Sequence, residues 1–203
     1  MPDGDDVRRL PAGAHGIPAD VVARNQRERL VAAVAEACAE RGYAETSVAD
    51  LARRAGVSTA TFYKLFPGKR ECALEAHQEL LGRLLDEVDR ACVEAGEGEA
   101  RLRVGVTTVP ELLAADPPSA RLLTVEVMAL GPEGAERNDT AIASFASRLR
   151  ASRGTDADPD RPHADWAVIA SISMLVGKRV MAGEAATVPE LEEELVAMLV
   201  ESL

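Results

Sequence analysis

Residues 46–70 read TSVADLARRAGVSTATFYKLFPGKR, and the rest of the chain is organised around this stretch. Ser47 precedes an apolar pattern at helical spacing and has Asp50 three residues later, as in the capping box that starts many helices. Gly56 can adopt the left-handed conformation that ends a helix. Ser58 then offers an N-cap for a second helix. The stretch therefore predicts two short helices joined by a tight turn.

The second of these helices has two different faces. Phe62 and Phe66 repeat at i, i+4 and predict an inner face, and Pro67-Gly68 ends the helix. The outer face carries polar and cationic groups, namely Thr59, Thr61, Tyr63 and Lys64, followed directly by Lys69 and Arg70. Such groups bond phosphates and base edges. The pattern is typical of a helix-turn-helix, whose second helix enters the major groove of DNA.

Further residues in and around this stretch complete a longer pattern. They are Gly42-Tyr43, Thr46-Ser47-Val48, Asp50-Leu51-Ala52, Arg54-Ala55-Gly56-Val57-Ser58, Thr61-Phe62-Tyr63, Phe66 and Lys69. In this order and without gaps, they resemble the N-terminal domain of the TetR family of bacterial transcriptional regulators, over about residues 22–76. Leu65 departs from the family pattern, in which a His or Tyr often contacts phosphate. The resemblance implies an all-α fold, with a three-helix helix-turn-helix head followed by a helical body for ligand binding and dimerisation.

The resemblance also implies which side chains contact operator DNA. Three residues open the second helix and are expected nearest to the base edges: Ser58, Thr59 and Ala60. Five more are expected to contact phosphates: Ser47, Thr61, Tyr63, Lys64 and Lys69. For Ser47 there is an added reason, because free N–H groups at a helix start favour an anion.

The charge of the chain is unevenly distributed. The formal net charge of −11 argues against a protein that binds nucleic acid over its whole surface. Residues 20–71 contain nine Lys/Arg and seven Asp/Glu, whereas the remainder contains 14 and 27. A mildly basic head on an acidic body is consistent with DNA contact confined to one end of the chain.

The apolar periodicity predicts a helical body after this head. We expect a flexible arm over 1–19, a DNA-binding domain over 20–70, and a ligand-binding and dimerisation domain over 71–203. Helices are predicted near 20–41, 69–94, 98–115, 118–130, 134–152 and 164–182, and from a Thr187-x-x-Glu190 capping box onward. The arm contains Arg8, Arg9 and His15, and is either a disordered tail or a segment that enters the minor groove. Arg27, on the polar face of the first helix, either contacts phosphate or stays solvated.

The body is expected to carry a dimer interface and a ligand cavity. The segment 164–182 is apolar nearly all round and should be buried on more than one side. The family resemblance implies that residues 164–203 form a four-helix bundle with a second copy. It also implies an effector cavity between residues 77 and 176, with Leu81, Leu122, Met128, Phe145 and Met174 as candidate walls. The scarcity of aromatics favours a largely apolar effector.

Other classes of function have less support in the sequence. A calcium-loop pattern from Asp156 and a GxGxxG pattern from Gly96 both fail at required positions, and the three cysteines form no CxxC. We therefore expect no cofactor, no metal and no catalytic site. The most apolar segment, 166–176, is shorter than the ~20 residues that span a bilayer, and residues 1–19 lack the apolar run of a signal peptide. A cytoplasmic location is expected.

The sequence therefore predicts a ligand-responsive homodimeric regulator. The expected form is a repressor of a palindromic operator that a small effector releases. The two alternatives are an enzyme, and a helical interaction module whose head does not bind DNA.

Overall fold

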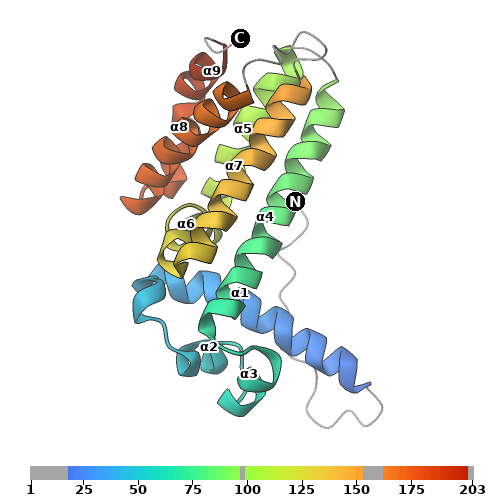
Figure 1. Cartoon of the computed structure of the whole chain (residues 1–203), viewed down its shortest axis with the longest axis vertical. Coiled ribbons are helices and arrows are strands. Elements are labelled where there is room, and N and C mark those ends of the chain that lie inside the picture. The colour runs from blue at the N-terminus through green and yellow to red at the C-terminus, as the bar shows by residue number, and fades with distance from the viewer. Residues whose placement is uncertain (1–17, 97–98, 153–161, 201–203) are drawn as a thin grey trace. The chain divides into compact units, whose positions relative to one another are not determined.

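The computed structural model describes residues 18–96, 99–152 and 162–200, and every regular element in these ranges is a helix (Figure 1). The expected all-α fold is confirmed. The chain divides into two compact units, here called the head, which ends at Ala76, and the body, which begins at His77. No helix among the described residues is long and apolar enough to cross a bilayer. The residues named in the predicted arm, Arg8, Arg9 and His15, lie outside the described ranges.

The head consists of α1 (Ala19–Glu45), α2 (Val48–Arg54), α3 (Thr59–Leu65) and the first turns of α4 (Lys69–Ala95). α1 buries an apolar stripe that includes Leu30, Val34 and Cys38, and it packs against both α2 and α3. At Gly42 the chain leaves helical geometry, with φ 79° and ψ 159°, before one further turn that ends at Glu45. Side chains disfavour this positive φ, so a glycine suits the position.

The head extends beyond its predicted end at residue 70, because the first two turns of α4 belong to it. Cys72, Ala73 and Ala76 are all buried to 1% exposure or less. These small side chains let the start of α4 complete the head core. The structure therefore places the boundary after Ala76, inside α4, and not at the start of that helix.

The described part of the body contains the rest of α4 and seven further elements. They are α5 (Glu99–Ala115), α6 (Pro117–Thr124), the 3₁₀ helix η1 (Glu126–Leu130), α7 (Pro132–Ser152), α8 (Pro162–Met181), the 3₁₀ helix η3 (Ala185–Leu191) and α9 (Glu192–Val200). α5 packs against η3, and α8 packs against both α6 and α7. One part of the body core joins α5, α6, α8 and η3 through Leu113, Ala120, Val176, Val180 and Val188.

Two predicted helices of the body differ from the observed ones. The segment 118–130 is not one helix: α6 ends at Thr124, and a 3₁₀ helix follows in which Glu126 is buried and paired with Arg121 at 2.8 Å. The predicted capping box at Thr187 is wrong. Thr187 lies inside η3, where its hydroxyl donates to the carbonyl of Glu184 and therefore caps no helix start.

Candidate nucleic-acid interface and effector cavity

The start of α2 is fixed by the predicted capping box. The backbone N–H of Asp50 donates to Ser47 Oγ at 3.1 Å, and the backbone N–H of Ser47 donates to Asp50 Oδ2 at 3.3 Å. Bonds from the Ser47 hydroxyl and then from the Arg53 guanidinium lower the pKa of Asp50 to about 2. This carboxylate therefore already occupies the helix start at which Ser47 is predicted to contact phosphate.

α3 presents the predicted recognition residues on its outer side. Ser58 caps the helix, because its Oγ accepts from the backbone N–H of Thr61 at 3.0 Å. Most of the predicted contacts are exposed, namely Ser58, Thr59, Ala60, Tyr63 and Lys64, and Thr61 is half-buried. Phe62 and Phe66 point inward, with ring centroids 5.7 Å apart. The inner pair thus holds α3 on the head while its hydroxyls, phenol and ammonium face outward.

Lys69 is placed differently from the other predicted contacts. Its ammonium donates to the carbonyls of Tyr43, Ala44 and Thr46 at 3.0, 3.2 and 2.8 Å, and lies 4.4 Å from the centre of the Tyr43 ring. An ammonium has three donors, and here all three are directed to backbone oxygens. Lys69 therefore stabilises the end of α1, a role that the sequence pattern did not indicate.

Arg27 is a second residue whose role became visible only in the structure. Its guanidinium forms an ion pair with Glu75, donates to the carbonyl of Leu65 at 2.9 Å, and lies 4.3 Å from the centre of the Phe66 ring. It therefore links α1 and α4 to the last turn of α3. The local sequence carries no signal for this role, because the partners lie 38 and 48 residues away.

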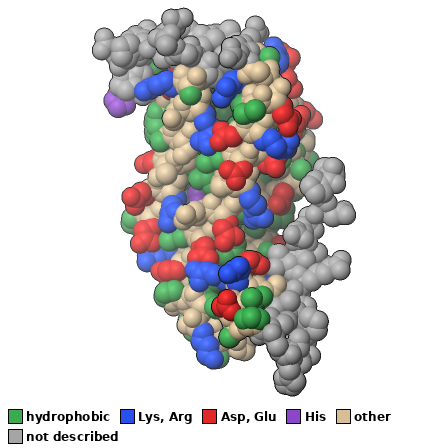
Figure 2. All heavy atoms as spheres, turned by 90° about the vertical axis from the view of Figure 1, so that its right-hand side faces the viewer, with side chains coloured by type: hydrophobic (Ala, Val, Ile, Leu, Met, Phe, Trp, Pro, Cys, Tyr) green, Lys and Arg blue, Asp and Glu red, His purple; other side chains and the backbone are tan. Residues whose placement is uncertain are grey.

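Many arginines on the surface are neutralised by neighbouring acids. Figure 2 shows acidic and basic side chains interspersed over the face that it presents. In the head, Arg54 pairs with Glu36 and Glu40 at 3.1 and 2.5 Å. Lys64, by contrast, is exposed on α3 itself and is available to a phosphate.

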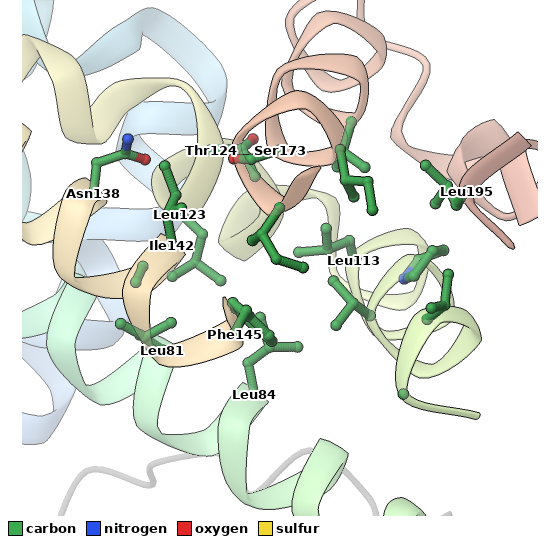
Figure 3. Close-up of a pocket in the computed structure, with 18 of the residues that line it drawn as sticks. Leu81, Leu84, Leu113, Leu123, Thr124, Asn138, Ile142, Phe145, Ser173 and Leu195 are labelled. Carbon is green, nitrogen blue, oxygen red and sulfur yellow. The ribbon is translucent and has the colours of Figure 1, made fainter. Parts of the chain in front are cut away.

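The body contains a cavity of about 130 Å³ between α4, α5, α6, α7, α8 and α9. Its lining is mostly aliphatic, and Figure 3 shows Leu81, Leu84 and Phe145 together on one side. Thr124, Asn138 and Ser173 lie on the other, and these three residues are called the polar side here. His77 also lines the cavity. The arrangement suits a ligand that is apolar over most of its surface.

A second cavity of about 330 Å³ adjoins the first. Five residues line both: Gly105, Val106, Phe145, Ile169 and Leu199. The far wall of the second cavity is charged, because Arg148 forms two bonds of 2.7 Å with Asp89 there. The guanidinium of Arg148 lowers the pKa of Asp89, and burial raises the pKa of Cys92 on the same wall. The two cavities therefore share one wall, and the lining of the first is the more apolar.

Comparisons with known proteins assign this architecture to a family. Residues 30–76 match the family described as bacterial regulatory proteins, tetR family. The chain is also 31% identical over 180 residues to the HTH-type transcriptional regulator EthR of Mycolicibacterium smegmatis, in an alignment that covers 85% of this chain and 81% of that protein. The chain belongs to the TetR family.

Two solved structures resemble nearly the whole TetR-family chain. A transcriptional regulator from Rhodococcus sp. Rha1 is 25% identical with a TM-score of 0.73, and the match covers 87% of this chain and 95% of that one. The regulator FadR from Bacillus subtilis, solved in complex with stearoyl-CoA, is 18% identical with a TM-score of 0.71, over 87% of this chain and 98% of that one. The protein is thus a DNA-binding transcriptional regulator in a family of ligand-responsive regulators.

The structure brings only some of the predicted wall residues to the TetR-family cavity. Leu81 and Phe145 line it. Leu122 is fully buried in packed core, with no exposed surface, and is not among the lining residues. Met128 and Met174 are 55% and 76% exposed. Both therefore lie at the surface of the body and not in the wall of the cavity.

α8 of this TetR-family chain has an exposed apolar face. The exposed fractions of Trp166, Met174 and Met181 are 40%, 76% and 62%, respectively. Spacings of seven and eight residues are close to two helical turns, so the three side chains lie on one face of α8. This face falls within residues 164–203, where the dimer interface is predicted.

Proposed function

We propose that the protein is a repressor that binds a palindromic operator as a homodimer and is released by a small, largely apolar effector. The observation that carries the proposal is the pairing of two separate features. α3 presents an outward face of hydroxyl, phenol and ammonium groups, and the body holds an aliphatic cavity.

DNA recognition is assigned to the exposed start and outer face of α3. Ser58, Thr59 and Ala60 occupy the first turn, which in helix-turn-helix proteins reaches the base edges. Tyr63 and Lys64 stand further along the same exposed side and are suited to phosphates. Ser47 and Thr61 remain proposed phosphate contacts beside them. Lys69 can contact a phosphate only if its ammonium breaks one of its three hydrogen bonds to backbone carbonyls.

Dimerisation is assigned to residues 164–203. The exposed face of α8, with Trp166, Met174 and Met181, supports this assignment. Burial of large apolar side chains against a partner lowers the free energy of the complex, so such faces often mark interfaces. Two copies of the head then present two α3 helices, which matches an operator built as an inverted repeat. Regulators of the TetR family bind operator DNA as dimers.

The effector class is supported by the lining of the body cavity and by the relatives. Leucine, valine, isoleucine and phenylalanine supply most of the wall. A structural relative was solved with stearoyl-CoA, and a Bacillus subtilis fatty acid metabolism regulator is 26% identical over 88 residues. We propose that the effector of this protein likewise carries an aliphatic chain, which the adjoining second cavity extends.

Selection of bound duplexes from a random DNA library tests the proposal. The expected product is an inverted repeat whose binding weakens steeply with salt. A long-chain acyl-CoA or fatty alcohol added to the complex should then release the protein. Selected sequences without a repeat contradict the dimeric operator, and DNA binding that rises with the lipid contradicts the repressor-and-release scheme. A double variant, Tyr63→Ala with Lys64→Ala, is the matched control. It should bind the selected inverted repeat much more weakly than the wild type does.

A further inference from the structure

His77 is a buried polar residue whose ring nitrogens make no hydrogen bond of ordinary geometry to the described residues. Its side chain is 1% exposed, and neither ring nitrogen has a hydrogen-bond partner among the residues that the structure describes. Buried polar atoms without partners are uncommon in folded proteins, and a ligand or a water usually accounts for them. The free protein therefore carries an unsatisfied group at a position that lines the effector cavity.

The surroundings of His77 connect it to the polar side of the cavity. Leu123 and Arg137 both influence its ring, and they are the chain neighbours of Thr124 and Asn138. The hydroxyl of Thr124 donates its hydrogen bond to the carbonyl of Ala120 at 2.8 Å. Toward a ligand it can therefore act only as an acceptor. His77 thus shares the lining of an otherwise aliphatic cavity with the three residues of the polar side.

His77 is neutral at physiological pH. Burial, and then the nearby positive charge of Arg137, lower its pKa to about 4, although a weak hydrogen bond with the backbone of Leu123 raises it. Arg137 itself donates to Gln78 at 2.7 Å. A neutral imidazole has one donor and one acceptor. It matches an uncharged ligand group such as a hydroxyl, whereas a carboxylate would lose its hydration without gaining a charged partner from this ring.

We infer that His77 and the polar side form a recognition site for an uncharged hydroxyl or carbonyl group on an otherwise aliphatic effector. This inference rests on the proposed function, since it specifies the ligand of the same cavity. The polar group of the ligand bonds the imidazole beside Asn138 and Ser173. The aliphatic remainder lies against Leu81 and Phe145 and continues toward the second cavity. His77 thereby selects among apolar ligands by the presence of one neutral polar group.

The test compares two probes of equal length, 1-octanol and n-octane, by displacement of the neutral dye N-phenyl-1-naphthylamine from the full-length protein. The quantity of interest is the ratio of the octane dissociation constant to the octanol dissociation constant. Taking this ratio between variants cancels the different transfer of the two probes from water. In His77→Leu the ratio should fall about tenfold, since one hydrogen bond to a buried partner is lost.

Two further variants make the result specific. His77→Gln keeps a donor and an acceptor and should hold the ratio within about threefold of the wild type. Leu81→Ala removes apolar wall only and should weaken both probes alike. A ratio that is unchanged in His77→Leu overturns the inference, and so does a ratio lost in His77→Gln when that variant is folded. If neither probe displaces the dye from the wild type, the proposed apolar effector site fails as well, which separates the two conclusions.

Discussion

At the residue scale, Lys69 donates three hydrogen bonds to the backbone at the end of α1, where the Thr46 hydroxyl also donates to the carbonyl of Gly42. α1 ends at Glu45, and the carbonyls of Tyr43, Ala44 and Thr46 all accept from the Lys69 ammonium. Helix ends leave carbonyls without partners within the helix, and a cation at that end is favourable. Lys69 thus acts on the fold of the head, whatever contact it makes with DNA.

We expect Lys69→Ala to lower the free energy of unfolding of the protein by about 1–3 kcal/mol, because charge-assisted hydrogen bonds to three carbonyls are lost. Lys64→Ala is the matched control, since Lys64 is exposed and should change stability by less than about 0.5 kcal/mol. In DNA binding the roles of the two variants are exchanged, because Lys64 and not Lys69 is expected to contact phosphate. Lys64→Ala should lower the slope of log affinity against log salt by about one per subunit. If Lys69→Ala lowers that slope and leaves urea unfolding unchanged, Lys69 is a phosphate contact and not a structural one.

His77 predicts a dependence of stability on pH. Its pKa is about 4 in the folded chain, below the value of about 6.5 in an unfolded one. Below pH 6.5 the unfolded chain therefore binds a proton that the folded chain does not, and stability falls as the pH falls toward 4. Between pH 7.5 and 4.5 the wild type should lose about 2–3 kcal/mol more than His77→Leu in urea unfolding. Parallel losses in the two proteins would show that His77 does not titrate in this way.

At the scale of the element, α3 is a seven-residue helix that would not be stable alone. Ser58 caps its first turn, Phe62 and Phe66 anchor its inner side, and Arg27 bonds the carbonyl of Leu65 in its last turn. The outer face is consequently free to carry polar residues. Such a helix can change its base preference without loss of the head fold.

Capping and base contact can be separated at Ser58. Ser58→Ala removes the acceptor for the Thr61 N–H and should destabilise the head by about 1 kcal/mol, whereas Ser58→Asn keeps a good N-cap and should cost only a few tenths. If Ser58 also contacts bases, both variants should change the preferred operator sequence. Thermal unfolding measures the first effect, and duplex selection measures the second. Equal stability of the two variants would show that the cap contributes little.

At the scale of the whole molecule, the head and the body are separate compact units, one with the exposed face of α3 and the other with the cavity. The head core is closed by small residues at the start of α4, Cys72, Ala73 and Ala76. The body keeps two adjoining cavities and an exposed apolar face on α8. Incomplete packing and exposed apolar surface are both costly unless a ligand and a partner fill them.

The proposed dimer predicts different effects for two exposed methionines. Met174→Asp on α8 should raise the dimer dissociation constant at least about 30-fold, since a charge would enter an apolar interface. Met128→Asp is the control, because Met128 is comparably exposed but lies on η1. Sedimentation equilibrium measures both. A dimer that tolerates Met174→Asp and dissociates with Met128→Asp would move the interface from α8 to the η1 side of the body.

Sequence alone determined the head in some detail, including both helix starts in the helix-turn-helix and the inward phenylalanine pair. Capping and turn signals are local: the bond from the Thr61 N–H to Ser58 spans three residues and forms wherever that helix forms. The periodicity also predicted most helices of the body. It was wrong for Met128 and Met174, which were predicted to line the cavity and are exposed. An apolar residue on a helix is buried only when another element covers it.

Tertiary structure decided which residues form the sites. Leu81 and Leu122 belong to similar apolar stripes, yet one lines a cavity and the other lies in packed core. The same applies to Lys69, Arg27 and His77, whose surroundings are built from residues 23 to 60 positions away. A helical repeat indicates only that a side chain points inward. The groups it meets there depend on how distant helices pack, and that information is spread over the whole chain.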